Sequence, residues 1–163
     1  MKVIFLDIDG VLNSNFWNDT HQREISDGTL IDEEKVMLLG QLIRNTSAKV
    51  VLHSGWKFWF DSEVKPLRRE AESLISMLEK EGIKVNGVTP DHTTEEIRKS
   101  KKFSLVKASE ILAWVSQYDN IEKRIVIDDL DLHNEEIRKH QILTDASIGL
   151  TVENICEAER LLL

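Results

Sequence analysis

The chain has 163 residues, of which 41% are hydrophobic and 31% charged, a balance that fits one compact domain with a substantial core. The net charge of -8 excludes nucleic-acid binding over the whole surface, although a local basic patch remains compatible with it. The one cysteine, Cys156, cannot form an internal disulfide, and no apolar stretch approaches the roughly 20 residues of a membrane span. Without a recognisable signal peptide, we expect a cytoplasmic protein with a single domain over residues 1–163.

Short apolar runs alternate with segments of helical periodicity along the chain. The patterns predict, in order, a strand at 3–6, a helix at 32–44, a strand at 49–52, a helix at 62–81, a strand at 84–88, a helix at 107–117, strands at 124–127 and 141–143, and a helix at 152–162. This alternation is typical of parallel strands joined by right-handed crossovers. The fold class expected is therefore α/β, a three-layer Rossmann-like domain with a mainly parallel central sheet.

Polar residues of particular kinds follow three of these strands: Asp7, Asp9 and Gly10 after the first, Ser54 and Gly55 after the second, and Asp128 and Asp129 after the fourth. In addition, Lys107 lies at the start of the predicted helix that leads into the fourth strand. Open α/β sheets bind their ligands at the carboxyl ends of the strands, so these groups are expected to converge.

The residue types at these strand ends indicate phosphoryl chemistry. Several carboxylates with no cysteine suit a hard cation with oxygen ligands, which favours Mg²⁺ over Zn²⁺. A carboxylate beside such a cation stays ionised and can attack phosphorus, while a hydroxyl and an ammonium hold the phosphoryl oxygens. Gly10 and Gly55 are expected to permit close backbone approach and unusual dihedral angles at the turns.

Four stretches in this order resemble the motifs of haloacid dehalogenase-like (HAD) phosphatases: "DIDGV", "VVLHSGW", Lys107 and "VIDDLD". The resemblance spans residues 3–131. The stretches "DIDGVLN", "SGW" and "KASEILAW" are closer still to one branch, the HAD domain associated with Swiss-army-knife RNA-repair proteins.

The resemblance implies a Mg²⁺-dependent phosphatase. Asp7 would be the nucleophile that forms an aspartyl-phosphate, and Asp9 the acid and base. Ser54 would hydrogen-bond the phosphoryl group and Lys107 would offset the charge around the nucleophile. Gly55 would also contact the substrate.

Mg²⁺ would be held by the carboxylate of Asp7, the backbone carbonyl of Asp9 and the carboxylate of Asp128. Asp129 would join the metal shell or orient a metal-bound water, a role that Asp131 is a weaker candidate to share. Lys101 and Lys102 lie in a polar connection near Lys107 and are the weaker candidates for its role.

The spaces between the motifs leave no room for a separate cap domain, so a capless or minimally capped member with an open cleft is expected. Such a cleft suits a phosphate on a bulky substrate, such as a nucleic-acid end or a protein. In "GWKFWF", Trp56 or Trp59 would stack on a nucleobase, unless both pack under the following helix. The basic stretch 97–107 would steer a polyanion, unless it is a solvated helix surface.

Other classes of protein share parts of this pattern. A phospho-receiver domain also has acidic residues, a hydroxyl and a lysine at strand ends, but there the acidic pair is adjacent, whereas one residue separates Asp7 from Asp9. A catalytically quiet binding module with the HAD fold is a third reading, which the intact set of acidic residues disfavours. A dehalogenase has no need of the acid and base at Asp9. The sequence leaves the substrate and the oligomeric state open.

Overall fold

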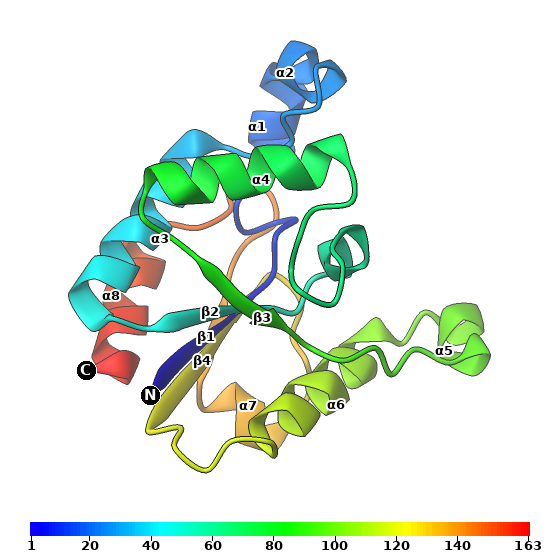
Figure 1. Ribbon diagram of the computed structural model, residues 1–163, viewed down its shortest axis with the longest axis vertical. Helices are drawn as coiled ribbons and strands as arrows, with labels where there is room; N and C mark the ends of the chain where they lie inside the picture. Colours follow the sequence, from blue (N-terminus) through cyan, green and yellow to red (C-terminus); the bar gives the residue numbers. More distant parts are fainter.

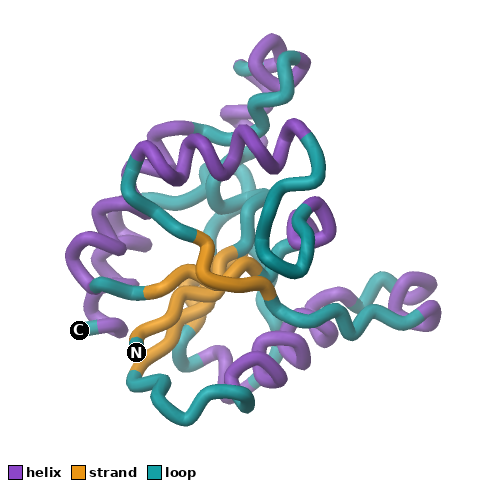
Figure 2. Tube along the Cα trace, viewed as in Figure 1, coloured by secondary structure: helices purple, strands orange, loops and turns teal.

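The computed structural model describes all 163 residues and is built on a sheet of five parallel strands in the order β3-β2-β1-β4-β5. The strands are β1 (Lys2–Leu6), β2 (Lys49–Leu52), β3 (Val85–Val88), β4 (Lys123–Asp128) and β5 (Gln141–Leu143). They lie side by side in the middle of the molecule with helices around them (Figure 2). The α/β class, the parallel sheet and the Rossmann-like layering predicted from the sequence are thus confirmed.

Helices cover both faces of the sheet (Figure 1). One face packs against α3 (Glu33–Thr46), α4 (Arg69–Lys80) and α8 (Val152–Leu162), and the other against α6 (Phe103–Val115) and α7 (Glu135–Arg138). Side chains of β1 alternate between the two resulting cores, with Ile4 and Leu6 in the first and Val3 and Phe5 in the second. This explains the unbroken apolar run of β1, because both of its faces are buried.

Two helices begin at other residues than the sequence predicts. The helix expected from residue 62 starts only at Arg69, because the Asp61 carboxylate accepts hydrogen bonds from the backbone of Glu63 and Lys65 and folds this stretch into a turn ahead of Pro66. The helix expected from residue 107 starts four residues earlier, at Phe103. Lys107 therefore lies in the second turn of α6.

Two segments predicted as loops contain short helices. Residues 13–30 form α1 (Asn15–Thr20) and α2 (Gln22–Ser26), and the polar connection before α6 forms α5 (Glu95–Ser100). Both groups project from the body of the molecule (Figure 1). Both α1 and α5 begin at a hydroxyl cap, provided by Ser14 and Thr94 respectively. None of the helices is long and apolar enough to cross a bilayer.

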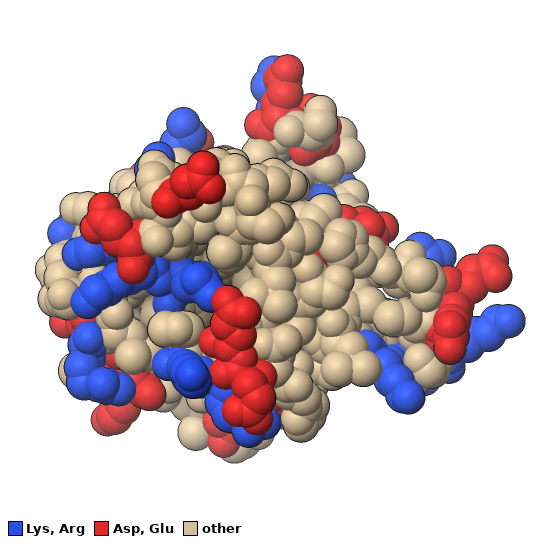
Figure 3. Space-filling model, turned by 90° about the horizontal axis from the view of Figure 1, so that it is seen from below, with Lys and Arg blue, Asp and Glu red and all other residues tan.

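On the face shown in Figure 3, basic and acidic side chains lie next to one another over one half of the molecule and again at the opposite edge, and the surface between these two regions is largely uncharged. Helix α5, in which the basic stretch 97–107 begins, has Glu95 and Glu96 in its first turn and Arg98 and Lys99 in its last turn.

Candidate active site

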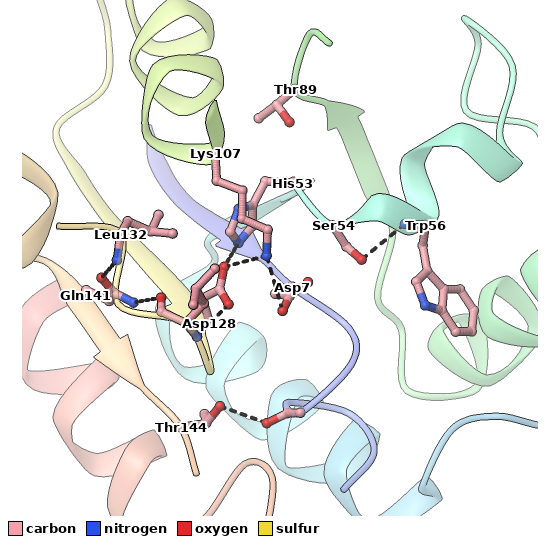
Figure 4. A network of polar contacts seen from close by, with 12 residues as sticks. Asp7, His53, Ser54, Trp56, Thr89, Lys107, Asp128, Leu132, Gln141 and Thr144 are labelled. Carbon is pink, nitrogen blue, oxygen red and sulfur yellow. Dashed lines mark hydrogen bonds and ion pairs between the residues drawn. The ribbon is translucent and has the colours of Figure 1, made fainter. Parts of the chain in front are cut away.

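Three carboxylates meet at the carboxyl ends of β1 and β4. Figure 4 shows two of them, Asp7 and Asp128. Asp7 follows β1, Asp128 ends β4 and Asp129 comes next, and one oxygen of each lies within 4.8 Å of the others. The parallel register pairs Leu6 with Ile127, and the Asp7 amide donates to the Ile127 carbonyl at 3.0 Å. Neighbouring parallel strands thus deliver their terminal carboxylates to one point.

Lys107 reaches this cluster from α6. Its Nζ lies 2.8 Å from Oδ2 of Asp128 and 3.5 Å from Oδ2 of Asp7. Lys101 and Lys102 are exposed and form no ion pair with the cluster. The structure therefore brings Lys107 to the cluster and leaves out Lys101 and Lys102, although Lys107 lies in the second turn of α6 and not at its start as expected.

The three carboxylates of the cluster face a single cation, Lys107, and all three have raised pKa values. Burial raises the pKa of Asp7, and burial together with the nearby Asp7 charge raises the pKa of Asp128 to about 6. Burial also raises the pKa of Asp129. Burial alone lowers the pKa of the Lys107 ammonium, but Asp7 and Asp128 outweigh this effect and the net pKa is raised.

The donor set fits a divalent cation. Three ionised carboxylates against one ammonium leave an excess of two negative charges, which is the charge that a dication neutralises. All three donors are carboxylate oxygens, the ligand type that Mg²⁺ prefers. Asp131 is not part of this set, because its side chain is 43% exposed and accepts a hydrogen bond from the His133 amide instead.

Gly10 holds a conformation that no other residue adopts without strain. Its φ is +80°, and a Cβ at this position would lie 2.5 Å from Oδ2 of Asp129. The Gly10 carbonyl accepts a hydrogen bond from Oγ1 of Thr144 at 2.8 Å, and the Thr144 amide donates to the Asp128 carbonyl at 3.0 Å. Thr144, which the sequence analysis missed, ties these two turns together, and its place directly after β5 was the signal for it.

Asp9 points away from the carboxylate cluster. Its exposed side chain accepts from Nδ2 of Asn13 at 2.9 Å and from Nε1 of Trp56 at 3.2 Å, so that each carboxylate oxygen has a donor. Oδ1 of Asn13 in turn accepts from the Gly10 amide at 3.0 Å. These contacts fix the orientation of the Asp9 carboxylate.

Of the two alternatives that the sequence leaves open for Trp56, stacking on a nucleobase or packing, the structure shows packing. The Trp56 ring is only 4% exposed and packs in the core beside Trp59, with the two ring centroids 4.7 Å apart. Trp59 is also partly buried against this core, and Arg68 lies over its ring at 4.2 Å. The sequence suggested stacking because several aromatic residues follow Ser54 closely. In the structure, both tryptophan rings pack against the protein core instead.

The three residues that follow β2, His53, Ser54 and Gly55, lie beside the carboxylate cluster or line the adjoining cavity. Ser54 is buried, and its Oγ accepts from the Trp56 amide at 3.1 Å, capping the short 3₁₀ helix η1 (Gly55–Trp59). His53 is fully buried 3.5 Å from Oδ2 of Asp128, and burial lowers its pKa well below 6.5. At Gly55 an added Cβ would meet no atom within 4 Å, so the expected need for glycine there is not borne out by any contact.

A family model covers nearly the whole chain. The model described as the HAD domain in Swiss Army Knife RNA repair proteins matches residues 3–155. Comparison with curated proteins and with solved structures gave no match. The match extends from the first residues of β1 into α8 and includes every residue of the site described above.

Proposed function

Because the chain belongs to the family of HAD domains in Swiss Army Knife RNA repair proteins, we propose that it is a Mg²⁺-dependent phosphatase that hydrolyses a phosphomonoester through an aspartyl-phosphate. The observation that carries the proposal is the convergence of Asp7, Asp128 and Asp129 with Lys107 at one end of the sheet. A structural cluster would pair its charges, whereas this one leaves two negative charges for a divalent cation to neutralise.

In the first step, an oxygen of the Asp7 carboxylate attacks phosphorus as the bond to the leaving oxygen breaks. Asp9 donates a proton to that oxygen, which departs as an alcohol. Ser54 and Lys107 bind the phosphoryl oxygens, and the ammonium also offsets the charge of Asp7, which lies 3.5 Å from it. The product of this step is an acyl phosphate on Asp7.

In the second step, Asp9 accepts a proton from water as the water oxygen attacks phosphorus. The bond between phosphorus and Asp7 breaks, and inorganic phosphate leaves with the Asp7 carboxylate restored. Asn13 and Trp56 support both steps by holding the Asp9 carboxylate in place. They act through Asp9 and do not contact the substrate.

Mg²⁺ would be held by the carboxylates of Asp7, Asp128 and Asp129 and by the backbone carbonyl of Asp9. When bound, it neutralises charge on the phosphoryl oxygens and so favours attack by an anionic nucleophile. The raised pKa of Asp128, about 6, means that metal and proton compete for this carboxylate in mildly acidic solution.

Phosphate release from p-nitrophenyl phosphate in the presence of Mg²⁺ tests this proposal. The wild-type protein should turn the compound over, and Asp7→Asn should abolish turnover while the circular dichroism spectrum stays unchanged. The same exchange at exposed Asp119 is the matched control and should leave turnover intact. Turnover that survives in Asp7→Asn would remove Asp7 from the role of nucleophile. Phosphorylation without release would instead indicate a phospho-receiver.

A further inference from the structure

A cavity of about 390 Å³ opens beside the candidate active site, a volume typical of small-molecule sites. Ser54 and Lys107 line it, so it adjoins the place proposed for the phosphoryl group. Its other walls come from η1, from α6 and from α5, which projects away from the sheet (Figure 1). A substrate with its phosphate at Asp7 would therefore extend its leaving group along this cavity toward α5.

Two charged residues in the wall of this cavity, Lys57 and Glu110, are paired with each other. Nζ of Lys57 lies 2.8 Å from Glu110, 2.8 Å from the Pro90 carbonyl and 3.3 Å from Oγ1 of Thr89. Glu110 also accepts from the His92 amide at 2.9 Å. The three hydrogens of the Lys57 ammonium are therefore taken, and both of these contacts to Glu110 use the same oxygen, Oε2.

Two phenylalanine rings line the cavity and remain exposed. Phe58, on η1, is 54% exposed, and Phe103, at the start of α6, is 44% exposed, although both line the cavity. Arg98, on α5, also lines the cavity and forms no ion pair. The cavity thus combines a phosphate site beside Ser54 and Lys107, aromatic walls, and a free guanidinium on α5.

We propose that this cavity binds the terminal nucleotide of a phosphorylated polynucleotide end, with the base against Phe58 and Phe103 and the next phosphate of the chain paired with Arg98. A polynucleotide end carries a terminal phosphate, an aromatic base and a second phosphate. The cavity offers Ser54 and Lys107 to the first, the two phenylalanine rings to the base and Arg98 to the second phosphate. The proposal rests on the proposed phosphatase function, because it places the terminal phosphate at Asp7.

A phosphopeptide matches these walls less well. The side chain of a phosphoserine carries no planar ring to cover Phe58 and Phe103, and the Lys57 ammonium has no hydrogen left to donate to a peptide carbonyl. Base stacking needs only a ring face and tolerates different bases. The pairing by Arg98 adds selectivity for a second phosphate, since a guanidinium binds phosphate through two parallel hydrogen bonds.

Binding measured by fluorescence anisotropy tests this assignment without turnover. The Asp7→Asn protein with Mg²⁺ is titrated with a short labelled oligonucleotide phosphorylated at the 3′ end, the same oligonucleotide phosphorylated at the 5′ end, the unphosphorylated form, and a phosphoserine peptide. The same protein carrying Phe58→Ala, Phe103→Ala or Arg98→Ala is titrated in parallel. Two variants are the matched controls. Phe16→Ala removes an exposed ring outside the cavity, and Lys99→Ala removes a charge next to Arg98 in the chain.

We expect one of the phosphorylated oligonucleotides to bind more tightly than the unphosphorylated form and the peptide. Each cavity variant should weaken this binding by about tenfold, and the controls by less than about twofold. Equal affinity in cavity variants and controls, or preference for the peptide, would overturn the proposal. These results are independent of the p-nitrophenyl phosphate assay, so a failure of the phosphatase proposal would be recognised separately by absent turnover in the wild-type protein.

Discussion

Replacing Asp128 with Asn should remove the free-energy cost of an ionised, buried carboxylate, which the metal-free protein carries at neutral pH. Burial and the nearby Asp7 charge raise the pKa of Asp128 from 3.8 to about 6. Since one pKa unit corresponds to about 1.36 kcal/mol, the ionised carboxylate costs the metal-free fold about 3 kcal/mol. The native state binds the proton more tightly than the unfolded chain, so this cost is absent below about pH 4 and develops as the pH rises to about 6 and above.

Urea unfolding in the presence of EDTA measures this cost. The free energy of unfolding of Asp128→Asn relative to the wild-type protein should rise by about 2 kcal/mol between about pH 4.5 and about pH 7.5, because about 1 kcal/mol of the cost is already present at the lower pH. The comparison between two proteins cancels the titration of shared groups that do not interact with Asp128. Asp119→Asn, the same exchange at an exposed position, should show no such change relative to the wild-type protein.

Mg²⁺ should reverse the order of stabilities at the higher pH. Binding to the native state stabilises the wild-type protein in proportion to the logarithm of the metal concentration, whereas Asp128→Asn lacks a ligand and should gain much less. A difference in unfolding free energy that stays constant with pH in EDTA would refute the reasoning. It would show that the Asp128 carboxylate is not held in the buried, crowded setting described here.

Two further variants test how the site is supported. Trp56→Phe keeps the ring but removes the donor to Asp9, and should lower kcat for p-nitrophenyl phosphate about tenfold with little change in KM; an unchanged kcat would exclude this positioning role. Lys57→Met leaves Glu110 buried without its cation and should lower the free energy of unfolding by about 3 kcal/mol, much of which Lys57→Met combined with Glu110→Leu should restore. An equal loss of unfolding free energy in the single and double variants would show that lost packing, and not the unpaired charge of Glu110, destabilises the protein.

The sequence was most informative where local pattern and burial agree. The strands have apolar residues on both faces, and so their positions and parallel pairing were predictable. The convergence of Asp7 with Asp128 followed from the general rule that ligands bind at the carboxyl ends of parallel strands, without knowledge of the register.

What the sequence could not provide depends on contacts between distant segments. The Trp56 ring was expected to face a substrate, but its Nε1 donates to Asp9, 47 residues away in the chain. The turn built around Asp61 delays the start of α4, although the apolar spacing beyond it is helical. The cavity has the same origin, because Phe58 and Phe103 line it from separate elements and nothing in the sequence indicates that these two rings come together.

Covalent capture of phosphorus by Asp7 is the central claim, and chemical trapping tests it most directly. The wild-type protein is quenched in acid during turnover of p-nitrophenyl phosphate with Mg²⁺ and treated with borohydride, which reduces an aspartyl-phosphate to homoserine. Peptide mass spectrometry should then find homoserine at position 7, dependent on both substrate and Mg²⁺. Phosphate release at the full rate with position 7 unmodified, or with homoserine at another aspartate, would contradict the account.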